Sequence, residues 1–162
     1  MTFGLSLEDF TLLHTVLSLV GIATGLIVAF GMLANARLDG WTAIFLVTTV
    51  LTSVTGFFFP FAGVTPAIIV GAISMAVLAI AIAARYLFDL RGPWRWIYVV
   101  TALAALYLNS FVGVVQAFQK QPFLQPLAPT QSEPPFLIAQ AAVLIFFVVI
   151  GAIALRRFHP DD

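Results

Sequence analysis

Few side chains in this sequence could carry out chemistry, and most of them are uncharged amides and hydroxyls inside long apolar stretches. One of the amides is that of Asn109, and the one imidazole among these groups is that of His14, each within its own apolar stretch. Imidazole and amide groups can bind a polar ligand, and they are costly to bury without a partner. Helical spacing predicts one shared pocket in the outer half of a membrane, formed by His14, Ser18, Thr52, Asn109, Ser110, Gln116 and Gln140.

His14 has two interpretations. A neutral imidazole held by hydrogen bonds to Asn109, Gln116 or Gln140 would be structural. The same ring could instead contact a ligand or respond to pH. The second histidine, His159, is predicted on the opposite side of the membrane, so the two cannot ligate one haem iron.

Other reactive chemistry is missing from the sequence. There is no cysteine, so thiolate nucleophiles, thiolate metal sites and disulfides are excluded. No acidic residue lies in the middle of an apolar stretch, which leaves no carboxylate pair for acid–base catalysis and no evident ion relay. The hydrolase, metalloprotease and nucleotide-binding motifs are also missing. We therefore expect a non-enzymatic protein without a cofactor or metal.

The composition indicates the environment in which these groups must be held. The chain has 162 residues, of which 62% are hydrophobic and only 9% charged, and its mean hydropathy is +1.09. A soluble domain of this size has too little interior to bury so much apolar surface. This excludes a soluble globular domain, a disordered chain and a nucleic-acid-binding protein. We expect an integral membrane protein whose main contact is the lipid bilayer.

Five apolar segments are long enough to cross the hydrocarbon core, which takes about 20 helical residues. We predict an all-α bundle of five transmembrane helices in a single domain, residues 1–162. The alternative has four spans and a hairpin that only dips into the membrane. The predicted spans are residues 10–33, 41–59, 66–90, 94–118 and 136–155, and the longest connection is 119–135.

The basic residues predict the orientation of the bundle. With five spans, six cations fall on one side of the membrane, namely Arg37, Arg85, Arg91, Arg95, Arg156 and Arg157. Only Lys120 falls on the other side. Because short cytoplasmic loops are enriched in Lys and Arg, we expect a periplasmic N-terminus and a cytoplasmic C-terminus. Some of these arginines could also bind anionic lipid headgroups, although a simple Arg85–Asp89 pair is the plainer interpretation.

Small residues recur at helical spacing on one face of each predicted span. They are Gly21, Gly25, Gly71, Ser74, Gly113 and Gly151. Small residues let helix backbones approach closely in a membrane, so these positions predict helix packing. The other interpretation is that the same faces line a water-filled or ligand-filled cavity.

The connection 119–135 contains five prolines with apolar residues between them. Connections of this length without secondary structure are often functional. One interpretation is a lid or docking surface over the polar pocket, and the other is a segment lying on the lipid headgroups.

Two segments resemble a known group of proteins. The stretches LYLNSFVGVVQAFQK (106–120) and LAPTQSEPPF (127–136) are similar to segments of uncharacterised small proteobacterial inner-membrane proteins. The resemblance implies a bacterial inner membrane and brings no activity or substrate with it. The leading hypothesis is an accessory or scaffold subunit that binds other membrane subunits or its own copies. The alternatives are a transporter or channel for a neutral or amphipathic solute, and a quinone- or lipid-binding protein.

Overall fold

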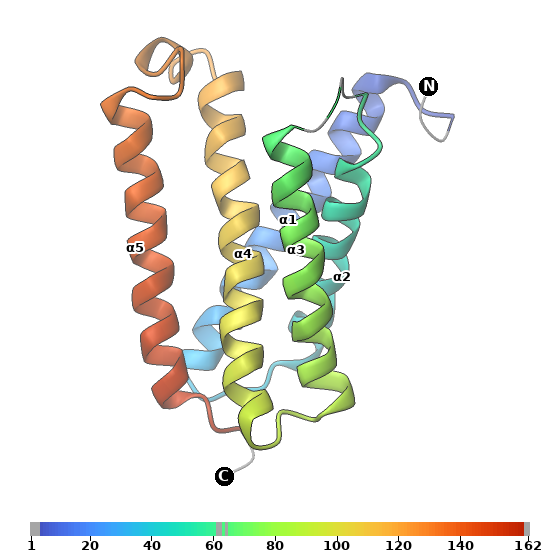
Figure 1. Cartoon of the computed structure of the whole chain (residues 1–162), viewed down its shortest axis with the longest axis vertical. Coiled ribbons are helices and arrows are strands. Elements are labelled where there is room, and N and C mark those ends of the chain that lie inside the picture. Colours follow the sequence, from blue (N-terminus) through green and yellow to red (C-terminus); the bar gives the residue numbers. More distant parts are fainter. Residues whose placement is uncertain (1–3, 61–62, 64, 161–162) are drawn as a thin grey trace.

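The computed structural model describes residues 4–60, 63 and 65–160. Their regular structure is entirely helical, and no strand occurs among them. The α-helices are α1 (Leu7–Leu33), α2 (Asp39–Gly56), α3 (Pro66–Ile82), α4 (Pro93–Lys120) and α5 (Pro134–Arg157) (Figure 1). A short π-helix, η1 (Ala83–Leu87), continues α3, and a 3₁₀ turn, η2 (Gln125–Leu127), lies between α4 and α5.

Four helical segments are long and apolar enough to cross a membrane: α1, α3 with η1, α4 and α5. These segments indicate a multi-pass membrane protein. The helix α2 is not one of the four: its 18 residues are enough in number, but five of them are threonines, so it is less apolar than the others. A fifth span at α2 therefore stays a prediction.

Two of the observed α-helices end before their predicted bounds. The helix α2 ends at Gly56, whereas the prediction extended it to residue 59. The regular α-helix of the third segment ends at Ile82, and the five residues that follow form η1 instead of continuing to residue 90. A π-helix inserts an extra residue into a turn, so it rotates the side chains that follow it around the helix axis.

Local chemistry fixes where two of the helices begin. The Ser6 hydroxyl accepts a hydrogen bond from the Asp9 N–H at 3.0 Å, which caps α1. Thr65 caps α3 in the same way, and Pro66 follows at the first helical position. These contacts satisfy N–H groups that have no partner within their own helix.

The helix α4 lies at the centre of the bundle and contacts each of the other four α-helices (Figure 1). The start of α1 and the α2–α3 and α4–α5 connections lie at one end, the upper end in Figure 1. The α1–α2 and α3–α4 connections and the end of α5 lie at the other, the lower end. These two ends bracket the sites described below.

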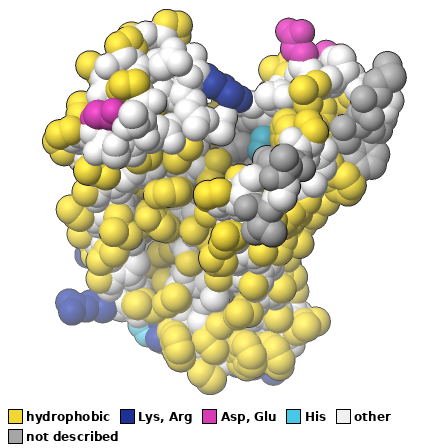
Figure 2. Space-filling model, turned by 45° about the horizontal axis from the view of Figure 1, so that its top comes forward, with side chains coloured by type: hydrophobic (Ala, Val, Ile, Leu, Met, Phe, Trp, Pro, Cys, Tyr) yellow, Lys and Arg dark blue, Asp and Glu magenta, His cyan; other side chains and the backbone are white. Residues whose placement is uncertain are grey.

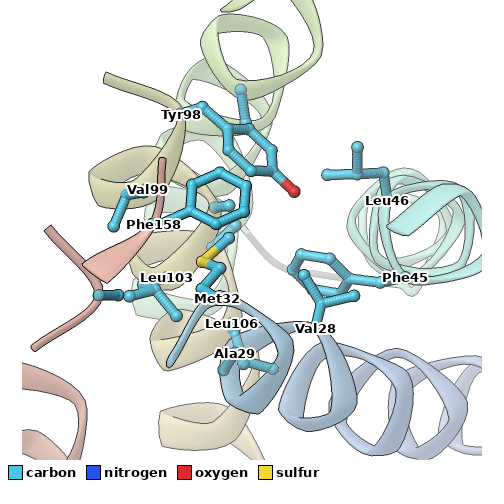
Figure 3. Close-up of a cluster of buried hydrophobic side chains, with 14 of the residues drawn as sticks. Val28, Ala29, Met32, Phe45, Leu46, Tyr98, Val99, Leu103, Leu106 and Phe158 are labelled. Carbon is cyan, nitrogen blue, oxygen red and sulfur yellow. The ribbon is translucent and has the colours of Figure 1, made fainter. Parts of the chain in front are cut away.

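A cluster of buried apolar side chains joins all five α-helices and includes the residue that follows α5. Figure 3 labels members of this cluster: Val28, Ala29, Met32, Phe45, Leu46, Tyr98, Val99, Leu103, Leu106 and Phe158. By contrast, many apolar side chains of α5 point outward, for example Ile138 and Ile145, which are 67% and 62% exposed. In a membrane such a surface is covered by lipid or by another helix.

Candidate functional site

The structure brings Ser18 and Asn109, two of the predicted pocket residues, into direct contact. The Ser18 hydroxyl donates to the Asn109 side-chain oxygen at 2.7 Å, and the Asn109 amide donates to the Ser18 backbone carbonyl at 3.2 Å. Asn109 is 8% exposed. This reciprocal pair ties α1 to α4 and satisfies amide groups that would be costly to bury alone.

His14 bonds to α2, and not to any of the amides that the sequence suggested. Its Nδ1 atom lies 2.8 Å from the Thr55 hydroxyl. That hydroxyl has a single proton, which it donates to the Leu51 carbonyl of its own helix at 2.7 Å. With that proton on the Leu51 carbonyl, Thr55 accepts from His14, and a neutral imidazole in this arrangement is the tautomer with its proton on Nδ1. The Nε2 atom is then left with a free lone pair.

The remaining predicted pocket residues make separate contacts. Gln140 donates to the Phe111 carbonyl at 3.2 Å and so ties α5 to α4, while its side-chain oxygen is buried without a partner in the described structure. Thr52 and Ser110 each donate to a carbonyl of their own helix. Gln116 is exposed. Six of the seven residues thus make hydrogen bonds within or between helices, and Ser18 and Asn109 are the two that bond to each other.

Two of the three glycines of α1, Gly21 and Gly25, lie where neighbouring helices approach it closely. A Cβ atom at Gly21 would lie 3.0 Å from the Thr49 hydroxyl and 3.2 Å from the Asn109 amide nitrogen. One at Gly25 would lie 2.5 Å from Leu106 and 2.8 Å from the ring of Phe45. A methyl group at Gly25 would therefore force a neighbouring side chain to shift, whereas one at Gly21 would need its neighbours to move by only a few tenths of an ångström.

The other predicted packing positions are less crowded. A Cβ at Gly71 would meet the Phe57 ring at 3.1 Å, whereas Cβ atoms at Gly113 and Gly151 would have their nearest neighbours at 3.5 and 3.7 Å. Ser74 on α3 is 6% exposed.

The upper end of the molecule is hollowed. Figure 2 shows the hollow between the α4–α5 side and the side built from α1, α2 and α3, with a histidine at its floor and a basic side chain at its edge. His14 is the histidine of α1, and Lys120 ends α4 at this end of the bundle.

The long connection packs on its own two helices and does not cover the His14 side of the hollow. Ala128 is buried with Phe118 and Phe136 in a small apolar cluster. The Gln131 amide donates to the Val115 carbonyl of α4 at 3.1 Å. Two residues of the connection point into solvent or lipid, since Phe123 is 71% exposed and Leu127 is 50% exposed.

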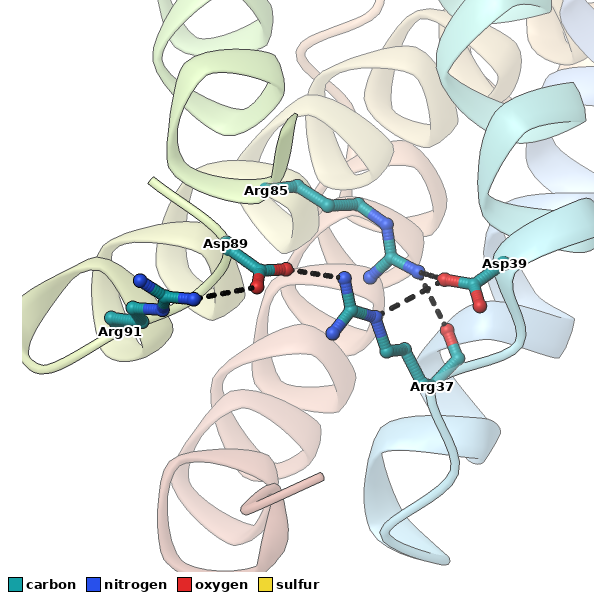
Figure 4. A network of polar contacts seen from close by, with 5 residues as sticks. All are labelled: Arg37, Asp39, Arg85, Asp89 and Arg91. Carbon is teal, nitrogen blue, oxygen red and sulfur yellow. Dashed lines mark hydrogen bonds and ion pairs between the residues drawn. The ribbon is translucent and has the colours of Figure 1, made fainter. Parts of the chain in front are cut away.

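Four of the six arginines lie in or next to the connections at the lower end, and Arg156 and Arg157 end α5 there. Three of them form a network with two aspartates (Figure 4). Arg37 bonds to Asp89 at 2.7 Å and to Asp39 at 3.2 Å, and Arg91 lies 3.7 Å from Asp89. Arg85 pairs with Asp39 and also donates to the Arg37 carbonyl at 2.9 Å. The network ties the α1–α2 connection to the α3–α4 connection.

The sequence suggested an ion pair between Arg85 and Asp89. In the structure Arg85 pairs with Asp39, and Asp89 pairs with Arg37. The chain leaves the regular α-helix at Ile82, so one-turn spacing does not hold between these two residues. Asp89 also has a left-handed backbone, with φ 49°. It turns to Arg37 instead, and Arg85 points inward to Asp39. Sequence reasoning missed Arg37 and Asp39 as partners because they lie nearly 50 positions away along the chain.

Arg85 enters the protein interior beside two other polar groups. It is 1% exposed, and its guanidinium lies 5.3 Å from the centre of the Tyr98 ring. Its Nε and Nη1 atoms, the Tyr98 hydroxyl and the Thr42 hydroxyl are all buried without a hydrogen bond of good geometry among the described residues. The ring face of Tyr98 therefore provides part of the stabilisation of the buried charge.

Two carboxylates outside the helices have shifted pKa values. The hydrogen bond from Arg37, together with its charge, holds the pKa of Asp89 below its ordinary value of 3.8. Desolvation works to raise the pKa of Glu133, but hydrogen bonds from Thr130 and Ser132 outweigh it and lower that pKa. Both groups are therefore ionised at neutral pH.

No cluster of three or more His, Asp or Glu side chains that could hold a metal ion occurs within residues 4–60, 63 and 65–160. No protein-family model, curated protein or solved structure matches the chain. The function must therefore be argued from the arrangement itself. The hydrogen bonds between helices are suited to assembly, and the upper hollow presents an imidazole and an ammonium group.

Proposed function

We propose that the protein is a five-span inner-membrane bundle that acts as a non-enzymatic accessory or scaffold subunit of a membrane complex. The observation that carries this proposal is the use of the polar side chains in the helices. Asn109, His14 and Gln140 each bond to a neighbouring helix, and several threonines bond to their own helix. Side chains used in this way hold helices together and leave no set of reactive groups.

The position of the charges supports a periplasmic N-terminus and a cytoplasmic C-terminus. All six arginines lie at the lower end and Lys120 at the upper end. Trp41 and Trp96 are about half exposed at the same lower end, where aromatic side chains suit the headgroup region. The helix α2 is about 27 Å long, which approaches the thickness of the hydrocarbon core. Because it packs along α1, we propose it as the fifth span.

The outer helix α5 supports a role in a larger assembly. It contacts α4 along its length but α1 much less, and most of its apolar side chains are exposed. In the proposal this face meets lipid or a partner subunit, which cannot be distinguished by hydrophobicity alone since both are apolar.

Native mass spectrometry of the full chain, extracted gently from its own membranes, tests the accessory role. We expect a second protein at a fixed ratio. A chain found only as a monomer would overturn the proposal. A reporter fused after Asp162 tests the topology separately, and a periplasmic signal would overturn the five-span arrangement.

A second candidate function is transport of a small neutral or amphipathic solute, and the hollow at the upper end favours it. In that case Asn109→Leu and Gln140→Leu would abolish uptake in a folded protein. Uptake that is unchanged in both variants would remove this candidate.

A further inference from the structure

The hollow at the upper end holds two basic groups that the proposed accessory role does not use. We infer that it binds an anionic amphipath with a carboxylate head, such as a fatty acid, between His14 and Lys120. This inference goes beyond the accessory role and holds whether or not a partner subunit is present. Three features support it: an unused nitrogen on His14, a Lys120 side chain without a hydrogen bond or ion pair to a described residue, and the aromatic rings beside His14.

His14 presents one unused nitrogen. Its Nδ1 proton goes to Thr55, whose own proton goes to Leu51. The two nitrogens of an imidazole point in divergent directions, so Nε2 points away from Thr55. It accepts a hydrogen bond when the ring is neutral and donates one when the ring is protonated. A carboxyl head fits either state, since one proton is shared between the acid and the imidazole.

Lys120 supplies an uncommitted positive charge. It is exposed at the last position of α4, and it has no hydrogen bond or ion pair to any described residue. The nearby acidic side chain Glu133 is occupied, because it accepts hydrogen bonds from Thr130 and Ser132. Asp9 likewise accepts from the Ser6 hydroxyl at 2.6 Å. A carboxylate entering the hollow would meet the ammonium group without displacing either acid.

Aromatic rings lie beside His14 and suit an apolar tail. Phe59 packs edge-on against the His14 ring, with ring centres 5.1 Å apart, and Phe10 lies 5.0 Å from Phe59. Exposed leucines of α1, such as Leu12 and Leu13, continue the apolar surface toward the bilayer. A head held at the floor of the hollow would thus leave its tail among apolar side chains.

The charges select the ligand class. A cationic amphipath is repelled by Lys120, and an uncharged one gains only the hydrogen bond to His14. A carboxylate gains both, and a hydrogen bond between charged groups is roughly twice as strong as a neutral one. We therefore expect the carboxylate to bind tighter than the alcohol of the same chain length.

The test is a titration of the purified full chain in phosphatidylcholine nanodiscs with dodecanoate and, separately, with dodecanol, with empty nanodiscs subtracted. We expect saturable binding of dodecanoate and binding of dodecanol about tenfold weaker, the factor that corresponds to one charged hydrogen bond. Lys120→Gln should weaken dodecanoate binding by about the same factor, and Lys120→Arg should retain it. The matched control is Arg156→Gln, which removes an exposed charge from the opposite end and should change nothing.

Equal binding of dodecanoate and dodecanol, or wild-type binding by Lys120→Gln, would overturn the inference. His14→Gln provides a second measurement, and loss of dodecanoate binding is expected there too. Because the Lys120 side chain is exposed and makes no hydrogen bond or ion pair to a described residue, its variants should fold, and they keep the test decisive even where the His14 variant does not fold. Native mass spectrometry without added ligand tests the accessory role separately, so failure of one proposal can be told from failure of the other.

Discussion

Arg85 and Asp39 form an ion pair whose two members differ sharply in exposure. The Arg85 side chain is 1% exposed, while the side chain of Asp39 is 75% exposed. The pair therefore joins a buried cation to a carboxylate at the surface, and it connects η1 to the first turn of α2. Without Asp39 the guanidinium would keep only the Arg37 carbonyl as a hydrogen-bond acceptor among the described residues.

Asp39→Asn should destabilise the protein by about 1.5–3 kcal/mol, because it removes a charged hydrogen bond from a buried guanidinium. Adding Arg85→Met should recover much of that loss, since the double variant leaves no buried charge. The measurement is reversible unfolding in mixed micelles. A double variant that is as unstable as the sum of both single changes would contradict the pairing.

Asn109→Leu should cost about 1 kcal/mol, within the range measured for hydrogen bonds between membrane helices. Ser18→Ala should cost less, and the two changes together should cost less than their sum because they remove the same contact. The check is a double-mutant cycle by the same unfolding assay. Strictly additive effects would show that the two side chains do not interact.

Gly25→Ala should destabilise the bundle by about 1–3 kcal/mol, because the added methyl group would overlap the Phe45 ring. Gly113→Ala is the matched control, since its methyl group would meet only Ile22 at 3.5 Å. That control should be neutral or slightly stabilising through its better helix propensity. Melting temperatures of the two variants measure the difference, and equal losses would contradict close packing at Gly25.

The lowered pKa of Asp89 predicts how its contribution to the free energy of unfolding depends on pH. The unfolded chain takes up the proton near pH 3.8, while the folded chain takes it up only at lower pH. The contribution to stability is therefore complete above about pH 5, and it is lost as the pH falls through 3.8 toward the folded pKa. The melting-temperature difference between the wild type and Asp89→Asn should be constant from pH 7 to 5 and should disappear in stronger acid.

Glu133 also has a lowered pKa, but it is present in both the wild type and Asp89→Asn. Its effect on the melting temperature therefore cancels in the difference between them. A difference that grows as the pH falls would mean that Asp89 is stabilised in its protonated form, contrary to its bond with Arg37.

Local chemistry made much of the fold predictable. Ser6 with Asp9 begins α1, and Thr65 with Pro66 begins α3, and such caps are local because they depend on residues about three positions apart. The long apolar runs indicate membrane-spanning helices for a similarly local reason, since length and composition decide them. The site was less predictable. Helical spacing placed Asn109 and Ser18 on inward faces, but it assigned His14 amide partners, and Thr55 holds it instead.

The sequence by itself determined that this is an all-helical chain with the features of a multi-pass membrane protein, and that its arginines lie toward one end of its helices. These properties depend on composition and on spacing within single segments. Only the tertiary structure decided which polar groups meet. Arg85 pairs with Asp39 because a π-helix rotates it inward and because the α1–α2 connection reaches η1. Such contacts depend on the relative positions of segments about 50 residues apart, and spacing along one helix carries no information about them.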